Sequence, residues 1–208
     1  MSARTASRAA LIELRTERRV VEDGHRFLDE KRALLAHEVL DRLAGFRVRL
    51  ERFGELERSA AESLAHAVSS AGFEAVQLAP EVDTIGGELV QQRRSFLGTQ
   101  TVTDARIVSN RDGDARPDRP DRDADTVAGK CAHAHTAVAD EALPLATELG
   151  NLLRLVREFQ RTQRRVRALE KVVLPELRDE ERRMEEALEE IDQEDAIHVR
   201  LAARAEKR

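Results

Sequence analysis

The residues best suited to chemistry lie in the short run Cys131-Ala-His133-Ala-His135. Thiolate sulfur and imidazole nitrogen are ligands that zinc prefers, so the run could indicate a metal site. On a helix, however, residues 131 and 135 share a face while residue 133 points largely away, and no fourth ligand is close in sequence. Packed or solvated side chains are the better interpretation, and we expect no metal ion here.

Two further patterns could indicate an enzyme. Gly86-Gly87 lacks the spacing of either the dinucleotide-binding fingerprint or the P-loop, so no phosphate cradle is predicted. Carboxylates are abundant near the C-terminus, but no concave site is apparent that would raise the pKa of one of them for acid–base work. We therefore expect no catalytic residue, no cofactor and no enzyme activity in this chain.

The composition of the 208-residue chain leaves little material for a thick core, because 36% of residues are charged, 3% are aromatic, and Trp and Tyr are absent. The 35 basic residues are interleaved with 40 acidic ones, which disfavours nucleic-acid binding. No apolar run approaches the roughly 20 residues that span a bilayer, and the first residues lack the apolar core of a secretory signal. With one cysteine, the chain is expected to be soluble and cytoplasmic.

Two long segments carry the apolar spacing of a coiled coil and flank a different middle region. The first covers residues 1–73 and the second residues 139–208, each with apolar residues at steps of three and four. A narrow stripe cannot bury itself alone, so the second helix is expected to fold back antiparallel on the first. The predicted fold is mainly α: a long antiparallel two-helix coiled-coil hairpin with a small middle domain at the turn.

Residues 74–138 form this predicted middle domain. A stretch rich in β-branched residues over 99–108 predicts one or two short β-hairpins. Residues 110–125 combine two prolines with alternating charge, which predicts a flexible charged loop. A short helix is expected to follow, and Pro144 is expected either in the first turn of a helix or at a bend where the last helix begins.

Complementary charge is expected to align the two long helices. Residues 1–19 contain five arginines and two glutamates, whereas residues 178–195 contain ten carboxylates and three arginines. If the second helix begins near residue 139, the numbers of facing residues add up to about 208 to 212. This register predicts Arg18 opposite Glu190 or Glu194. It also predicts Arg32 opposite Glu176 or Glu180.

Two segments of the predicted helices carry residue combinations typical of one protein family. The first helix opens with Leu11-Ile-Glu-Leu-Arg15, and Gly24-His25 and Lys31-Arg32 follow it. The second segment, residues 162–177, combines basic residues, a Val-x-Ala-Leu-Glu run and a Val-rich stretch before Pro-x-Leu, through eight residues: Val166, Ala168, Leu169, Glu170, Val172, Val173, Pro175 and Leu177. Both segments resemble the D subunit of the V/A-type (vacuolar/archaeal-type) ATP synthases and ATPases, whose pattern is basic residues, Val-Asn-Ala-Leu-Glu, an aromatic residue and a Val/Ile-rich stretch before Pro-x-Leu.

The proline of this motif leaves two structural alternatives. Pro175 would cost about 3 kcal/mol in an ordinary helix interior, so the helix could stop at Leu174. The periodic run through Met184, Leu188 and Ile191 favours a kinked but continued helix. Arg167 and Lys171 depart from the usual family residues, Asn and an aromatic, which puts lineage-specific contacts in doubt.

The resemblance implies a non-catalytic central rotor-stalk subunit that transmits torque between the catalytic A/B hexamer and the membrane ion-translocating ring. Its implied partners are the A and B subunits, the small F subunit and a C/d-type adaptor, at a position peripheral to the membrane. If both termini insert into the hexamer, five arginines are candidate contacts: Arg8, Arg15, Arg19, Arg200 and Arg204. The periodicity alone would also permit a non-rotary coiled-coil adaptor or a chaperone-like protein.

Overall fold

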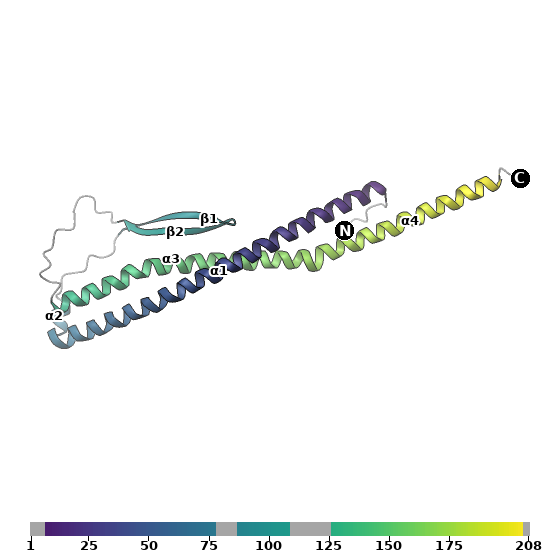
Figure 1. Cartoon of the computed structure of the whole chain (residues 1–208). Helices are drawn as coiled ribbons and strands as arrows, with labels where there is room; N and C mark the ends of the chain where they lie inside the picture. The colour runs from purple at the N-terminus through teal and green to yellow at the C-terminus, as the bar shows by residue number, and fades with distance from the viewer. Residues whose placement is uncertain (1–6, 78–86, 109–125, 206–208) are drawn as a thin grey trace. The chain divides into compact units, whose positions relative to one another are not determined.

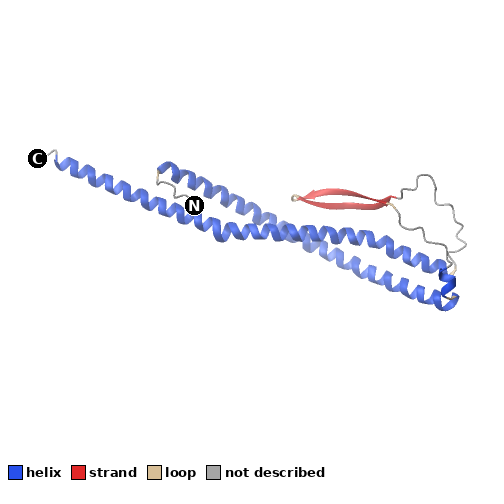
Figure 2. Cartoon of the chain, turned by 180° about the vertical axis from the view of Figure 1, so that it is seen from behind, coloured by secondary structure: helices blue, strands red, loops and turns tan. Residues whose placement is uncertain are grey.

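The computed structural model describes residues 7–77, 87–108 and 126–205 and is mainly helical (Figures 1 and 2). The predicted charged loop at 110–125 lies outside the described residues. The elements are α1 (Arg8–Ala71), α2 (Phe73–Gln77), β1 (Glu88–Phe96), β2 (Thr99–Val108), α3 (Val127–Ala168), a π-helical turn η2 (Leu169–Val173) and α4 (Leu174–Ala205). They form two compact units, one of Met1–Leu34 with Phe159–Arg208 and the other of Leu35–Glu158. We call these the end unit and the middle unit.

The end unit is built around a narrow apolar seam between α1 and α4. Ser7 caps α1, since its hydroxyl oxygen accepts a hydrogen bond from the Ala10 N–H at 3.1 Å. Leu14, Leu177 and Met184 are buried together at the seam. Five partly buried apolar residues pack around them: Ala10, Leu11, Val21, Val173 and Leu188. Leu177 and Met184 are one heptad apart, so the seam follows the predicted coiled-coil spacing.

The helix of the end unit continues through Pro175, which is the second residue of α4. The five residues before α4 form the π-helical turn, in which the Leu174 N–H donates to the carbonyl of Leu169. This wider turn gives the proline ring room where a regular α-turn would bring a carbonyl against it. A continued helix, rather than a stop at Leu174, is therefore confirmed.

The middle unit contains the remainder of α1 packed antiparallel on α3. Helix α1 ends at Ala71, and the following Gly72, with a φ of 82° and an N–H bond to the Val68 carbonyl at 3.1 Å, forms a left-handed C-cap. Helix α3 begins after Thr126, whose hydroxyl accepts from the Gly129 N–H at 3.0 Å. The second long helix thus starts at Val127, earlier than residue 139, and Pro144 lies inside α3 instead of in a first turn.

Strands β1 and β2 form one antiparallel hairpin, as predicted for the β-branched stretch. Leu97 and Gly98 connect the strands, and their φ angles of 48° and 84° are those of a type I′ turn, whose twist matches that of the paired strands. The register shifts between Gln92 and Arg93, where β2 carries one extra residue. At the base, Gly87 has no room for a side chain, because a Cβ would lie 2.6 Å from the Val108 carbonyl oxygen.

Candidate functional site

Three ion pairs cross between α1 and α4 at heptad spacing in the end unit. Arg8 bonds Asp192 at 3.0 Å, Arg15 bonds Glu185 at 2.5 Å, and Glu22 forms an ion pair with Arg178 at 3.5 Å. In each pair the two residue numbers add up to 200, so the helices run antiparallel at a single register. We call these three pairs the ion-pair ladder.

The sign of the ladder reverses at its last rung. Arginine lies on α1 in the first two pairs, whereas Glu22 on α1 faces Arg178 on α4 in the third. A slip by one heptad in one direction would place Arg15 opposite Arg178, and a slip in the other would place Glu22 opposite Glu185. Both slips bring like charges together, so the ladder selects one register out of those that the apolar stripe permits.

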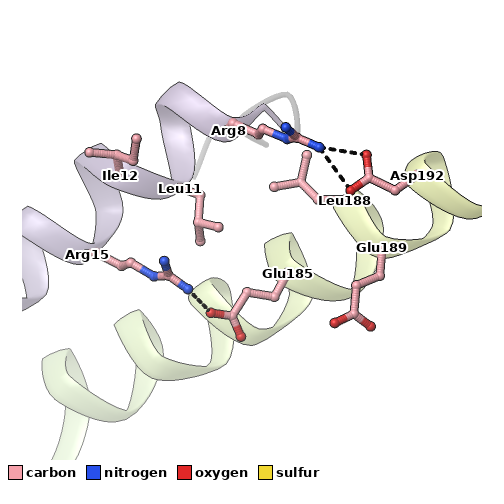
Figure 3. A pocket seen from close by; sticks show the side chains of 8 residues that line it. All are labelled: Arg8, Leu11, Ile12, Arg15, Glu185, Leu188, Glu189 and Asp192. Carbon is pink, nitrogen blue, oxygen red and sulfur yellow. Dashed lines mark hydrogen bonds and ion pairs between the residues drawn. The ribbon is translucent and has the colours of Figure 1, made fainter.

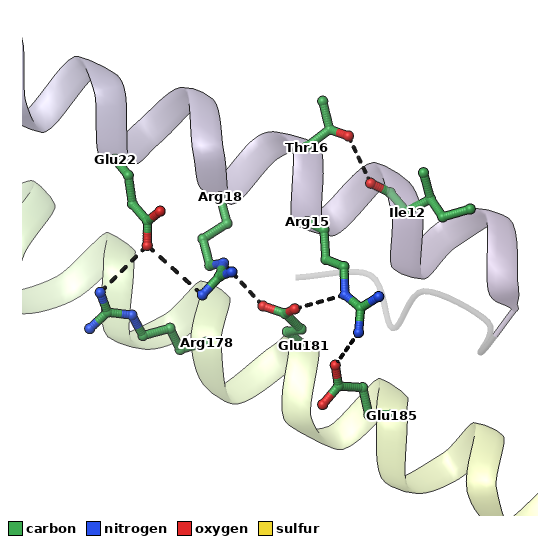
Figure 4. A network of polar contacts seen from close by, with 8 residues as sticks. All are labelled: Ile12, Arg15, Thr16, Arg18, Glu22, Arg178, Glu181 and Glu185. Atoms are coloured by element: carbon green, nitrogen blue, oxygen red, sulfur yellow. Dashed lines mark hydrogen bonds and ion pairs between the residues drawn. The ribbon is translucent and has the colours of Figure 1, made fainter.

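Glu181 joins the second and third rungs (Figure 4). Its carboxylate accepts from Arg15 at 3.0 Å through one oxygen and lies 3.1 Å from the Arg18 guanidinium through the other. The side chain of Glu181 is only 12% exposed, compared with 49% for Arg15. Burial weakens the screening of charges by water and salt. We therefore expect the ion pairs of Glu181 to contribute more to the stability of the end unit than the exposed rungs do.

These contacts correct the predicted register. Arg18 contacts Glu181, which lies nine residues, or about 13 Å of helix, from Glu190 and farther from Glu194. Arg32 pairs with Asp29 of its own helix at 2.6 Å. The prediction was wrong because it began the second helix at 139; the end of α1 at Ala71 and the start of α3 at Val127 give a sum of 198. The predicted attraction between the basic start and the acidic last helix is confirmed.

An open hollow lies beside the first two rungs (Figure 3). Leu11 and Leu188 point between the helices, while Ile12 points away from the seam. The carboxylates of Glu185 and Asp192 at its wall are bonded to Arg15 and Arg8. The hydrogen bonds to Glu185 and then Glu181 raise the pKa of Arg15, which remains a cation. Arg8 and Arg15 at this hollow are thus paired with the carboxylates of Asp192 and Glu185.

The run Cys131 to His135 has the geometry expected of one helix face. The Cys131 sulfur lies 3.7 Å from Nδ1 of His135, and that nitrogen is 2.9 Å from the Cys131 carbonyl oxygen. His133 is exposed. In the part of the chain that the structure describes, no group of three or more His, Cys, Asp or Glu side chains is placed to hold a metal ion. Likewise, no described helix is long and apolar enough to cross a lipid bilayer.

The candidate contact arginines differ in their surroundings. Arg8 and Arg15 are bonded within the ladder, although the Arg8 side chain is still 78% exposed. Arg19 and Arg200 are exposed on α1 and α4. Arg204 lies within α4, but its side chain is outside the described part. The structure thus unites Arg8 and Arg15 in one charged cluster, and their role toward a partner stays a prediction.

The family-motif residues surround the π-helical turn. Val166 and Leu177 are buried on either side of it, Val173 packs on the core, and Val172 is half exposed. The turn itself spans Leu169–Val173, so the motif combines seam contacts with an irregular helical turn.

Sequence reasoning missed the ladder, although its signal is present. Arg8, Arg15 and Glu22 repeat every seven residues, as do Arg178, Glu185 and Asp192, with complementary signs when one series is reversed. Searching for complementary charges at heptad spacing, instead of counting net charge, would have found the register. Glu181 could not be ranked above neighbouring carboxylates because its burial depends on the packed helix pair.

The helix pair has one selected register, set by its charges, and a π-helical turn. These features define the class: a helical protein organised around a coiled-coil seam. The family model of the ATP synthase D subunit matches residues 10–204. The D subunit of the V-type ATP synthase of Anaeromyxobacter dehalogenans (strain 2CP-C) is 34% identical over 204 residues, covering 96% of this chain and 95% of that protein.

Two further relatives agree with this match. The D subunit of the V-type ATP synthase of Anaeromyxobacter sp. (strain Fw109-5) is 34% identical, covering 100% of this chain and 97% of its own length. The D subunit of the A-type ATP synthase of Methanopyrus kandleri is 27% identical, covering 93% of this chain and 83% of its own length. The chain belongs to the family of ATP synthase D subunits. The resemblance drawn from the residue motifs is confirmed.

Proposed function

We propose that this chain is the central rotor-stalk subunit of a V/A-type ATP synthase or ATPase, transmitting torque between the catalytic A/B hexamer and the membrane ion-translocating ring. Membership of the D-subunit family supports this role. In this proposal the chain is non-catalytic, lies on the cytoplasmic side peripheral to the membrane, and binds the A and B subunits, the small F subunit and a C/d-type adaptor.

The observation that carries a mechanical role is the ion-pair ladder with its sign reversal. A shaft made of two helices transmits torque only if the helices resist sliding past each other under load. An apolar heptad stripe repeats and therefore favours every register that differs by seven residues, whereas the Glu22–Arg178 rung opposes both neighbouring registers. The buried carboxylate of Glu181, held by two arginines, strengthens this selection.

This mechanism requires the rotor subunit to make different contacts with the hexamer at different rotation angles. As the subunit turns, it would meet each of three catalytic interfaces in a different orientation, and its angle would bias their nucleotide affinities. Exposed arginines such as Arg19 and Arg200 suit this role, because surface ion pairs are each worth only about 0 to 1 kcal/mol and break readily as the shaft advances.

Co-expression tests the assembly. The chain produced with A, B and F subunits should co-purify at one copy per hexamer, and native mass spectrometry gives this stoichiometry. A hexamer recovered without the chain at low salt would overturn the rotor assignment and favour a non-rotary coiled-coil adaptor. Arg19→Glu should weaken recovery several-fold, whereas Arg26→Glu serves as the matched control because Arg26 already pairs with Asp23 on its own helix.

Rotation is tested separately on the assembled complex. A bead attached to the chain, with the hexamer fixed to a surface, should turn in one direction when ATP is added. Assembly without ATP-driven rotation of the bead would retain the subunit assignment and overturn the torque-transmitting role.

A further inference from the structure

The β-hairpin of the middle unit is held to α3 by the side chain of Asn151. The Asn151 Oδ1 accepts a hydrogen bond from the Val102 N–H at 2.8 Å, and its Nδ2 donates to the Val102 carbonyl at 2.7 Å. In an antiparallel sheet, a neighbouring strand likewise bonds both the N–H and the C=O of one residue. The amide of Asn151 therefore binds the outer edge of β2 as a strand would.

This contact is concentrated at one point of the hairpin. Thr101 and Val102 are 3% and 5% exposed, whereas every other described hairpin residue is exposed or partly exposed. Asn151 is itself only 2% exposed. Val102 has Arg93 of β1 as its cross-strand partner, and the register shift lies beside this pair. The N–H and C=O of Val102 are bonded to Asn151 of α3.

The hairpin needs such a contact to stay ordered. An isolated two-stranded hairpin is at best marginally stable in water, and much of the apolar surface of this one is exposed, including Leu89 and Ile107. A buried amide that satisfied the backbone of Val102 would offset this weakness. Without it, the N–H and C=O of Val102 would be buried without partners.

We propose that Asn151 is the docking residue of the hairpin: while its two hydrogen bonds are made, the hairpin moves as one body with α3, and when they break the hairpin detaches and loses its order. This inference concerns a conformational device in the middle unit and goes beyond the rotor role. It does not depend on that role being correct.

Hydrogen exchange of the full chain, measured by mass spectrometry, tests the docking. Asn151→Leu keeps a similar volume but removes both hydrogen bonds, and amides of β1 and β2 should exchange at least about tenfold faster. Amides near the start of α3 should be unchanged. Gln160→Leu is the matched control, since it also replaces an amide on α3, but at an exposed position; it should leave the hairpin protection as in the parent chain.

Asn151→Asp provides a chemical rescue that a role in packing alone would not show. A carboxylate can accept from the Val102 N–H but repels its carbonyl oxygen, whereas a protonated carboxyl group can make both bonds. Hairpin protection in N151D, relative to the parent chain at each pH, should therefore rise as the pH falls. Arg154 on α3 donates to Oδ1 of Asn151 at 3.2 Å and would favour the carboxylate, which moves this rise to lower pH. Arg93, the cross-strand partner of Val102, and Arg94, the partner of Thr101, are further cations of the hairpin and would act in the same direction.

Two results would overturn the proposal. One is hairpin protection in N151L within about twofold of the parent chain, with the helices intact by circular dichroism. The other is a deficit in N151D that does not change with pH. If N151L fails to fold, the pH dependence of N151D decides the question alone.

Discussion

Both units of the chain pair arginines with carboxylates across their helices, but the middle unit also holds its hairpin through a neutral amide. In the end unit, arginines and carboxylates cross the seam at heptad spacing, and Glu181 lies between two arginines. In the middle unit, Arg49 pairs with Glu141 and Glu148 across the helices, and a neutral amide, Asn151, binds the hairpin. Charges can choose among repeating helix registers, whereas a backbone edge is recognised by directional hydrogen bonds.

The charged contacts of the middle unit have a more local arrangement. Arg49 bonds Glu141 at 2.9 Å and Glu148 at 3.2 Å, so a single arginine spans two carboxylates that are one heptad apart on α3. The hydrogen bond to Glu141 is the largest of the effects that raise the pKa of Arg49. This bridge strengthens the contact between α1 and α3 at one position. It does not oppose slipping of the helices in the way that the Glu22–Arg178 pair does in the end unit.

The largest effect is expected from the apolar seam of the end unit, which should contribute more to the free energy of unfolding than the ion pairs do. Leu14 is fully buried against Leu177 and Met184, so Leu14→Ala should destabilise the chain by about 2 to 4 kcal/mol. Urea unfolding followed by circular dichroism measures this loss. Ile12→Ala is the matched control at a position 64% exposed, and an equal loss there would contradict the seam.

The next effect compares two largely buried carboxylates, one in each unit. Glu181→Gln leaves Arg15 and Arg18 without a negative partner at this position, and Glu141→Gln removes the closest negative partner of Arg49. Because Glu181 and Glu141 are 12% and 13% exposed but their arginines are more exposed, we expect losses of about 1 to 2 kcal/mol in the free energy of unfolding. Glu186→Gln, which breaks an exposed pair within α4, should cost less than about 0.5 kcal/mol.

A charge swap tests the sign reversal directly. Glu22→Arg should destabilise the end unit by about 1 kcal/mol, because two arginines then face each other. Adding Arg178→Glu restores the pair but gives all three rungs the same sign, so slipped registers are no longer opposed. Spin labels on α1 and α4 should then report a second distance, displaced by about 10 Å of helix rise. A single unchanged distance would show that apolar packing alone selects the register.

The smallest effect is expected at the exposed first rung. Arg8 and Asp192 are 78% and 60% exposed, so Arg8→Ala should change the free energy of unfolding by less than about 0.5 kcal/mol at moderate salt. A double-mutant cycle with Asp192→Ala measures the coupling of the pair, which should shrink further at about 1 M salt. A coupling above about 1 kcal/mol would place the first rung on a par with Glu181.

Much of the fold could be predicted because it depends on patterns within single segments. Apolar spacing predicted the two helices, the β-branched run 99–108 predicted a hairpin, and opposite charge predicted antiparallel pairing at the chain ends. The start of α3 was missed because it depends on the cap at Thr126, which lies outside the strongly periodic segment. That single boundary displaced the predicted register by about ten residues.

The sequence by itself determined the helical class, the antiparallel direction and the family, because periodicity, net charge and motif residues are local properties of the chain. The tertiary structure decided which charges meet, since a contact between Arg15 and Glu185 requires both helix starts to be known. It also decided that Leu169–Val173 widens into a π-helical turn before Pro175 and that Asn151 meets Val102. Each of these depends on the position of a distant or neighbouring backbone group, which residue types alone do not specify.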